Sequence, residues 1–120
     1  MKESLKDKVV RLAEEFVEEA YPLTLSFPIY ERFTLAGQLR RALISIPANI
    51  IEGAARGSNK QFYRFLCIAY ASLAEAKYLL KFAFKRGYIE KEIYKKVHDK
   101  AEELSKLLYS LKEAVKESLT

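Results

Sequence analysis

Apolar side chains in this sequence recur at the three- and four-residue intervals of an α-helix, and no segment alternates as a β-strand does. The pattern is clearest near the end of the chain, in a seam of Val97, Ala101, Leu104, Leu108, Leu111 and Val115. Three earlier segments repeat in the same way, and short connections between four helices favour neighbours that run in opposite directions. The sequence therefore predicts an all-α fold, an antiparallel up-and-down four-helix bundle that residues 1–120 form as a single domain.

Two prolines mark the connection between the first and second helices. Pro22 has no backbone N–H and disfavours helical geometry at Tyr21, so the first helix stops or kinks there. Pro28 makes a second interruption, and we place the connection at residues 26–30. The second helix then starts near Glu31, whose carboxylate suits the positive end of the helix dipole.

A third proline, Pro47, lies inside the second helix. It removes one backbone hydrogen bond and crowds the carbonyl group of Leu43, which costs roughly 3 kcal/mol in a helix interior. We therefore predict a helix kinked at this proline, with exposed backbone acceptors that Arg40 and Arg41 can reach. This structural role competes with a ligand-binding role for the two arginines.

The second and third helices meet at a short turn. Gly57 suits the left-handed residue that follows a helix, so the second helix ends near Arg56. Ser58 and Gln61 have the spacing of a capping box and start the third helix, which Gly87 ends. The third helix is apolar on more sides than one bundle core requires, which predicts a further buried contact between subunits.

A narrow polar stripe runs along the mostly apolar second helix. Its residues, at spacings of three and four, are Gln38, Arg41, Ser45, Asn49, Glu52 and Arg56. One interpretation is the solvated side of an amphipathic helix. The other is an interior or subunit-interface network containing Arg41, Asn49 and Glu52, because short amides and hydroxyls beside arginine satisfy one another. The sequence leaves both interpretations open. The network of the second interpretation also includes Gln38 and Ser45.

Positive charge is concentrated in the middle of the chain. The net charge is +5, and residues 1–30 carry a balance of −2 whereas residues 31–66 carry +4. Such asymmetry is typical of a protein that binds a polyanion. Backbone N–H groups at the start of the third helix also favour a phosphate. The predicted nucleic-acid-binding residues are Arg40, Arg41, Arg56, Lys60 and Arg64.

Other kinds of site find little support. Cys67 and His98 are the only residues of their types, so no metal-site spacing exists, and neither metal nor cofactor is expected. Glu52 and Glu75 lack a nucleophile or phosphate-binding loop beside them, which argues against an enzyme. No segment is long and apolar enough for a membrane span, and the charged start of the chain is unlike a secretory signal. We expect a cytoplasmic protein.

Several strings of residues carry a family resemblance. They are Ser26-Phe27-Pro28 with Glu31, Leu35-x-x-Gln38-Leu39-Arg40-Arg41-Ala42, Ser45-Ile46-Pro47-Ala48-Asn49-Ile50-x-Glu52-Gly53, and Phe62-x-Arg64-Phe65-Leu66-x-Ile68-Ala69 with Ser72-Leu73-Ala74-Glu75. With them, roughly residues 5–115 resemble the four-helix bundle proteins related to the 23S rRNA intervening-sequence protein. They are also similar to the accessory variability determinant of diversity-generating retroelements.

This resemblance implies a bacterial helical bundle that assembles as a ring-like homopentamer, has no known catalysis and meets nucleic acid, either RNA or DNA. Between Gly53 and Phe62, where relatives are expected to carry several basic residues, this chain has only Arg56 and Lys60. A second function class therefore stays open. In it the basic surface of a scaffolding protein binds an acidic protein partner and no nucleic acid.

Overall fold

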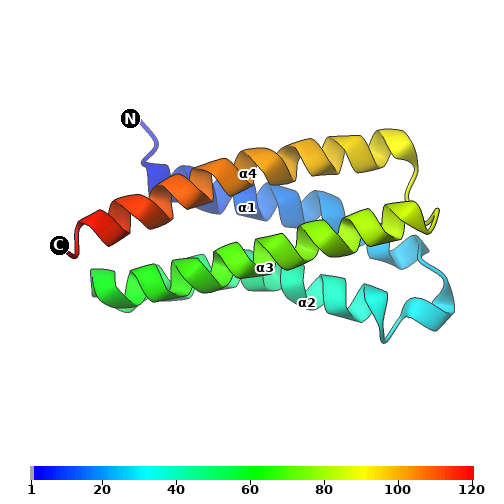
Figure 1. Cartoon of the computed structure of the whole chain (residues 1–120), viewed down its shortest axis with the longest axis horizontal. Coiled ribbons are helices and arrows are strands. Elements are labelled where there is room, and N and C mark those ends of the chain that lie inside the picture. Colours follow the sequence, from blue (N-terminus) through cyan, green and yellow to red (C-terminus); the bar gives the residue numbers. More distant parts are fainter. Residues whose placement is uncertain (1) are drawn as a thin grey trace.

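The computed structural model describes residues 2–120, so Met1, the first residue of the predicted domain, lies outside the described residues. Four helices run alternately in opposite directions (Figure 1), and no strand occurs within residues 2–120. The elements are α1 (Leu5–Ala20), the 3-10 helices η1 (Tyr21–Ser26) and η2 (Ile29–Glu31), α2 (Leu35–Ala55), α3 (Asn59–Lys85) and α4 (Lys91–Glu117). The predicted all-α four-helix bundle is confirmed.

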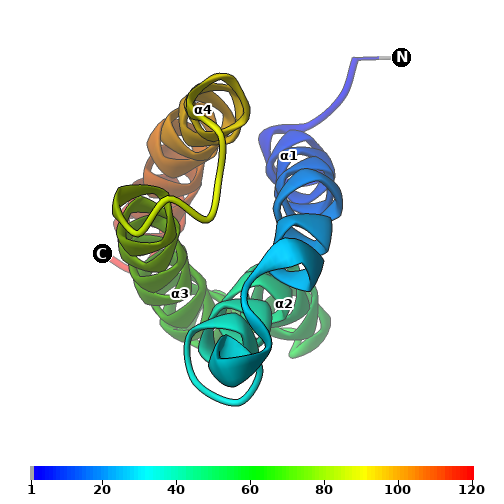
Figure 2. The ribbon, with the colours of Figure 1, turned by 90° about the vertical axis from the view of Figure 1, so that its right-hand side faces the viewer.

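The four helices close into a ring around one core. Each helix packs against the next along the chain, and α1 also packs against α4. Figure 2 shows the bundle from one end, with α2 between α1 and α3. Every helix contributes a fully buried side chain, among them Phe16, Leu43, Leu73 and Leu104. Burial of one such side chain contributes about 1.5–3 kcal/mol, so packing rather than local propensity holds the helices together.

The predicted boundary between α2 and α3 is confirmed. Gly57 has φ +83°, the left-handed geometry that an L side chain rarely adopts. The Ser58 side chain accepts a hydrogen bond of 3.2 Å from the backbone N–H of Gln61. Gly87 has the same φ after α3. These ends depend on residues within four positions of one another, which is why the sequence pattern located them.

The predicted start of α2 near Glu31 is wrong, because the helix begins at Leu35. Residues 29–31 form η2 instead, and a turn follows. The Glu31 carboxylate accepts hydrogen bonds from the Thr34 hydroxyl at 2.7 Å and the Tyr88 hydroxyl at 3.0 Å. The bond from Thr34, with that from Tyr88, lowers the pKa of Glu31. The carboxylate therefore holds the connection against the α3–α4 turn and does not begin a helix.

Pro47 lies inside α2, and the helix continues on both sides of it. The expectation that the arginines serve backbone acceptors near the proline is wrong. Arg40 donates its Nε–H to the Thr24 hydroxyl at 2.8 Å, and Arg41 makes no hydrogen bond within residues 2–120. Side chains on a helix tilt toward its N-terminus. Arg40 therefore reaches back to η1 and away from Pro47.

Candidate nucleic-acid interface

The polar stripe of α2 lies partly between α2 and α3. The Ser45 and Ser72 hydroxyls are 2.8 Å apart. Asn49 donates through Nδ2 to the Ser45 carbonyl at 2.7 Å and to its hydroxyl at 2.8 Å. Nearer the start of α2, Gln38 donates to the Glu75 carboxylate at 3.1 Å. These side chains form a line of polar contacts that joins the two helices.

The other members of the stripe lie farther from α3. Arg41 and Glu52 are exposed, and within residues 2–120 Glu52 pairs only with Arg56, one turn away, at 2.9 Å. Within one chain the half-buried part of the network is therefore limited to Ser45 and Asn49, and Gln38 joins α3 at the surface. A contact of Arg41 and Glu52 with a second copy stays a prediction.

Replacing Asn49 with alanine is expected to lower the free energy of unfolding by about 1 kcal/mol, because Ser45 loses its hydrogen-bond donor. A drop of several degrees in Tm by circular dichroism would show this effect. Gln61→Ala is the control, since Gln61 is an exposed helical amide at the start of α3. An equal Tm for Asn49→Ala and the parent protein would contradict a structural role for the polar line.

The structure divides the predicted nucleic-acid-binding residues into two groups. Arg40 and Arg41 lie in the first half of α2, whereas Arg56, Lys60 and Arg64 lie where α2 ends and α3 begins. Fifteen helical residues between Arg41 and Arg56 correspond to roughly 22 Å. One small ligand therefore cannot contact both groups, although an extended polymer can.

The first group borders an open groove of about 580 Å³. It lies beside the α1–α2 connection and is lined by Tyr21, Arg32, Phe33, Gly37, Arg40, Arg41, Ile44 and Ser45. The sequence interpretation missed Arg32, Phe33 and Tyr21. Pro28 was the signal that could have found them, because the interruption extends to Thr34 and turns this segment beside α2.

The second group is less concentrated. Arg56 pairs with Glu52, and its guanidinium lies 4.9 Å from the centre of the Phe65 ring. Lys60 and Arg64 are exposed on the first turns of α3. Neither forms an ion pair within the described part of the chain. This group offers solvated cations with no enclosing wall.

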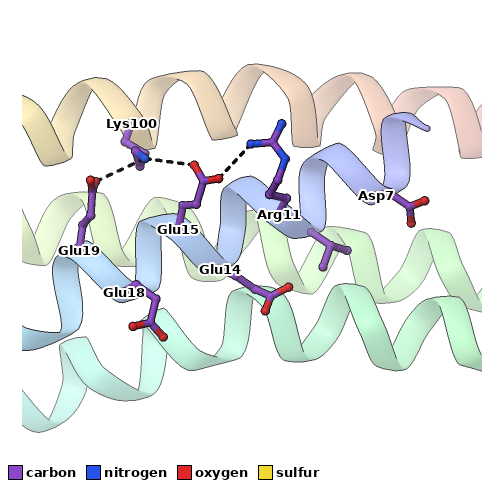
Figure 3. Close-up of a pocket in the computed structure, with 8 residues that line it drawn as sticks. Asp7, Arg11, Glu14, Glu15, Glu18, Glu19 and Lys100 are labelled. Atoms are coloured by element: carbon purple, nitrogen blue, oxygen red, sulfur yellow. Dashed lines mark hydrogen bonds and ion pairs between the residues drawn. The ribbon is translucent and has the colours of Figure 1, made fainter. Parts of the chain in front are cut away.

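A surface of the opposite charge follows the outer side of α1. In Figure 3, Asp7, Glu14 and Glu18 point away from α4, whereas Glu15 and Glu19 reach toward Lys100. Lys100 lies 3.2 Å from the Glu15 carboxylate and 3.6 Å from that of Glu19. Exposed carboxylates repel a polyanion. The distribution of charge therefore favours the side of α2 and α3 over that of α1.

Another lysine, Lys112, is enclosed by aromatic rings and is not free for a ligand. Its Nζ lies 4.8 Å from the ring centre of Tyr109, 5.6 Å from that of Tyr70 and 5.7 Å from that of Tyr63. It also pairs with Glu113 at 2.9 Å, and this hydrogen bond raises the pKa of Lys112. We assign this cluster to the packing of α4 on α3.

Within residues 2–120, no three or more His, Cys, Asp and Glu side chains are grouped so that they could hold a metal ion. The thiol of Cys67 is half-buried on α3. None of the helices in this part of the chain combines the length and apolar character that a membrane crossing needs.

Comparisons with known proteins give a consistent result. A family model described as 23S rRNA-intervening sequence protein matches residues 6–110. Among solved structures, the chain is similar to a protein of unknown function from the S23 ribosomal protein family of Bacteroides thetaiotaomicron. The two chains are 27% identical, the match covers 92% of this chain and 99% of that one, and the TM-score is 0.81. No match was found among curated proteins.

Proposed function

The chain belongs to the family of 23S rRNA-intervening sequence proteins, and from this membership we propose that it is a non-catalytic cytoplasmic protein that self-associates and binds nucleic acid. The proposed binding surface runs along α2 and the start of α3. It includes both groups of cations described above. A homopentamer is the assembly that the family resemblance favours.

The groove beside the α1–α2 connection is the observation that carries the nucleic-acid proposal. Arg32, Arg40 and Arg41 all line it, and none of them pairs with a carboxylate within residues 2–120. By contrast, Arg11 and Arg56 are both paired. Unpaired guanidinium groups in one groove attract a phosphate backbone. The family name, which refers to 23S rRNA, agrees with such a ligand.

Exposed apolar side chains on α3 support self-association. Ile68, Tyr78 and Phe82 lie on its outer side, and Tyr78 is 63% exposed. Ala71 and the exposed Glu75 lie in the same row, so that these residues follow helical spacing along about four turns with one carboxylate among them. A surface that gathers several exposed apolar side chains around one carboxylate is typical of a surface that another protein covers. A second copy of the chain is the proposed partner.

Fluorescence anisotropy with labelled RNA or DNA tests nucleic-acid binding. The logarithm of the binding constant is expected to fall linearly with the logarithm of the salt concentration. The slope is about 0.7 to 0.9 in magnitude for each phosphate neutralised. Replacing Arg41, Lys60 and Arg64 together with glutamine is expected to lower that slope by about 2 to 3, one phosphate contact for each cation removed.

The matched control replaces Lys91, Lys95 and Lys96, which are exposed on α4, with glutamine. It removes the same charge from a helix that does not contact α2. Equal loss of binding in both triple variants would indicate only a net-charge effect. Absence of binding to RNA and DNA at low salt, with capture of an acidic protein instead, would favour the scaffolding function.

A further inference from the structure

The groove beside the α1–α2 connection combines cations with an aromatic ring that nothing covers. Phe33 lies in the turn before α2 and is 86% exposed, more than any other large apolar side chain in the described residues. The Arg32 guanidinium lies 5.9 Å from the centre of its ring. An aromatic face beside guanidinium groups is the arrangement on which proteins stack the bases of single strands.

One cation on the other side of the groove, Arg40, is held in place by the fold. Arg40 donates its Nε–H to the Thr24 hydroxyl, and that hydroxyl donates to the Tyr21 carbonyl at 2.8 Å. Thr24 is buried, and the Arg40 guanidinium lies 5.9 Å from the centre of the Tyr21 ring. Its terminal N–H groups have no partner within residues 2–120, so they remain available to a phosphate.

Gly37 keeps the floor of the groove open between these groups. A Cβ atom at this position would lie 3.1 Å from the Arg32 carbonyl oxygen and 3.6 Å from a terminal nitrogen of Arg41. The volume of about 580 Å³ falls within the range of pockets that bind small organic molecules. The groove therefore has room for a flat ring between Phe33 and the arginines.

We propose that this groove binds an unpaired nucleotide within single-stranded nucleic acid, with the base stacked on Phe33 and a phosphate on Arg40 and Arg41. The inference rests on the proposed function and restricts its ligand to single-stranded nucleic acid. Bases of a duplex are stacked on their neighbours and cannot lie on a protein ring. The site therefore selects single strands and reads no particular sequence, because every base has a stacking face.

Three labelled probes of equal length test the inference: oligouridylate, a ribose-phosphate strand without bases, and a perfectly paired RNA hairpin. The parent protein is expected to bind oligouridylate most tightly. Phe33→Ala is expected to weaken that binding about fivefold to a hundredfold, because stacking on one ring is lost. It should leave binding of the strand without bases unchanged. Phe33→Trp should retain tight binding to oligouridylate.

Ile93→Ala is the matched control, since it removes an exposed apolar side chain from α4, a helix that does not contact α2. Circular dichroism and mass in solution establish that each variant keeps its fold and assembly. Equal binding of oligouridylate by Phe33→Ala and the parent would overturn the inference while nucleic-acid binding itself stands. A change of assembly mass in Phe33→Ala would also overturn it, because the ring would then belong to a subunit interface. Failure of the parent to bind any probe would overturn the proposed function as well.

Discussion

Replacing Ile68 and Tyr78 together with lysine is expected to convert the proposed assembly into folded single chains of 13.9 kDa. Both side chains are exposed in the single chain, so the helical bundle does not need them. In an assembly that covers the outer side of α3, each lysine would bring an unpaired charge into an apolar contact. Association is then lost while the fold is retained. Sedimentation velocity measures the mass, and circular dichroism measures the helix content.

Ile93→Lys with Leu119→Lys is the control for this prediction, because both residues are exposed apolar side chains outside α3. The control should keep the mass of the parent protein. If the parent itself sediments as a single chain, self-association is wrong. If the Ile68 and Tyr78 variant keeps the parent mass, the assembly uses a different surface.

Gly53→Ala is expected to lower the free energy of unfolding by about 1–3 kcal/mol. Helix propensity alone predicts the opposite sign, a gain of roughly 1 kcal/mol, because alanine favours a helix interior over glycine. We nevertheless expect a loss of stability, because α3 lies close to α2 at Gly53. A Cβ atom on Gly53 would lie 2.6 Å from the Cβ of Phe65 and 3.2 Å from a ring carbon of Phe62. A Cβ is fixed to the backbone, so the helices must separate.

Urea denaturation followed by circular dichroism measures this change. Ala48→Gly, on an exposed position inside the same helix, is the reverse control and is expected to lose about 1 kcal/mol through propensity alone. A Gly53→Ala variant that is more stable than the parent would show that α2 and α3 have room to adjust at this point.

Repetition of the groove around an assembly connects the two proposals. One groove with three cations and one exposed ring offers a modest contact with a single strand. Copies held in one closed assembly present the groove several times, so a strand that leaves one copy stays near the next. An assembly of five would therefore bind a long strand far more tightly than a single nucleotide.

The local sequence determined where most helices begin and end. Gly57 and Ser58 mark the boundary between α2 and α3. Gly57 has left-handed geometry, and Ser58 accepts a hydrogen bond from the backbone N–H of Gln61, three positions away. Helical spacing likewise identified the buried seam of α4. These features could be predicted because each depends on backbone geometry or on residues within about one turn, and the printed order of residues contains that information.

The candidate groove and the start of α2 were decided by the tertiary structure alone. Glu31 belongs to η2 and not to α2, and its carboxylate accepts a hydrogen bond from Tyr88, 57 positions along the chain. Arg40 reaches Thr24, 16 positions earlier, and this contact places it beside Phe33 in the groove. Spacing on one helix shows which side chains share a face, but it does not show which helix covers that face. The packing of segments that are far apart in the sequence decides which helix covers it.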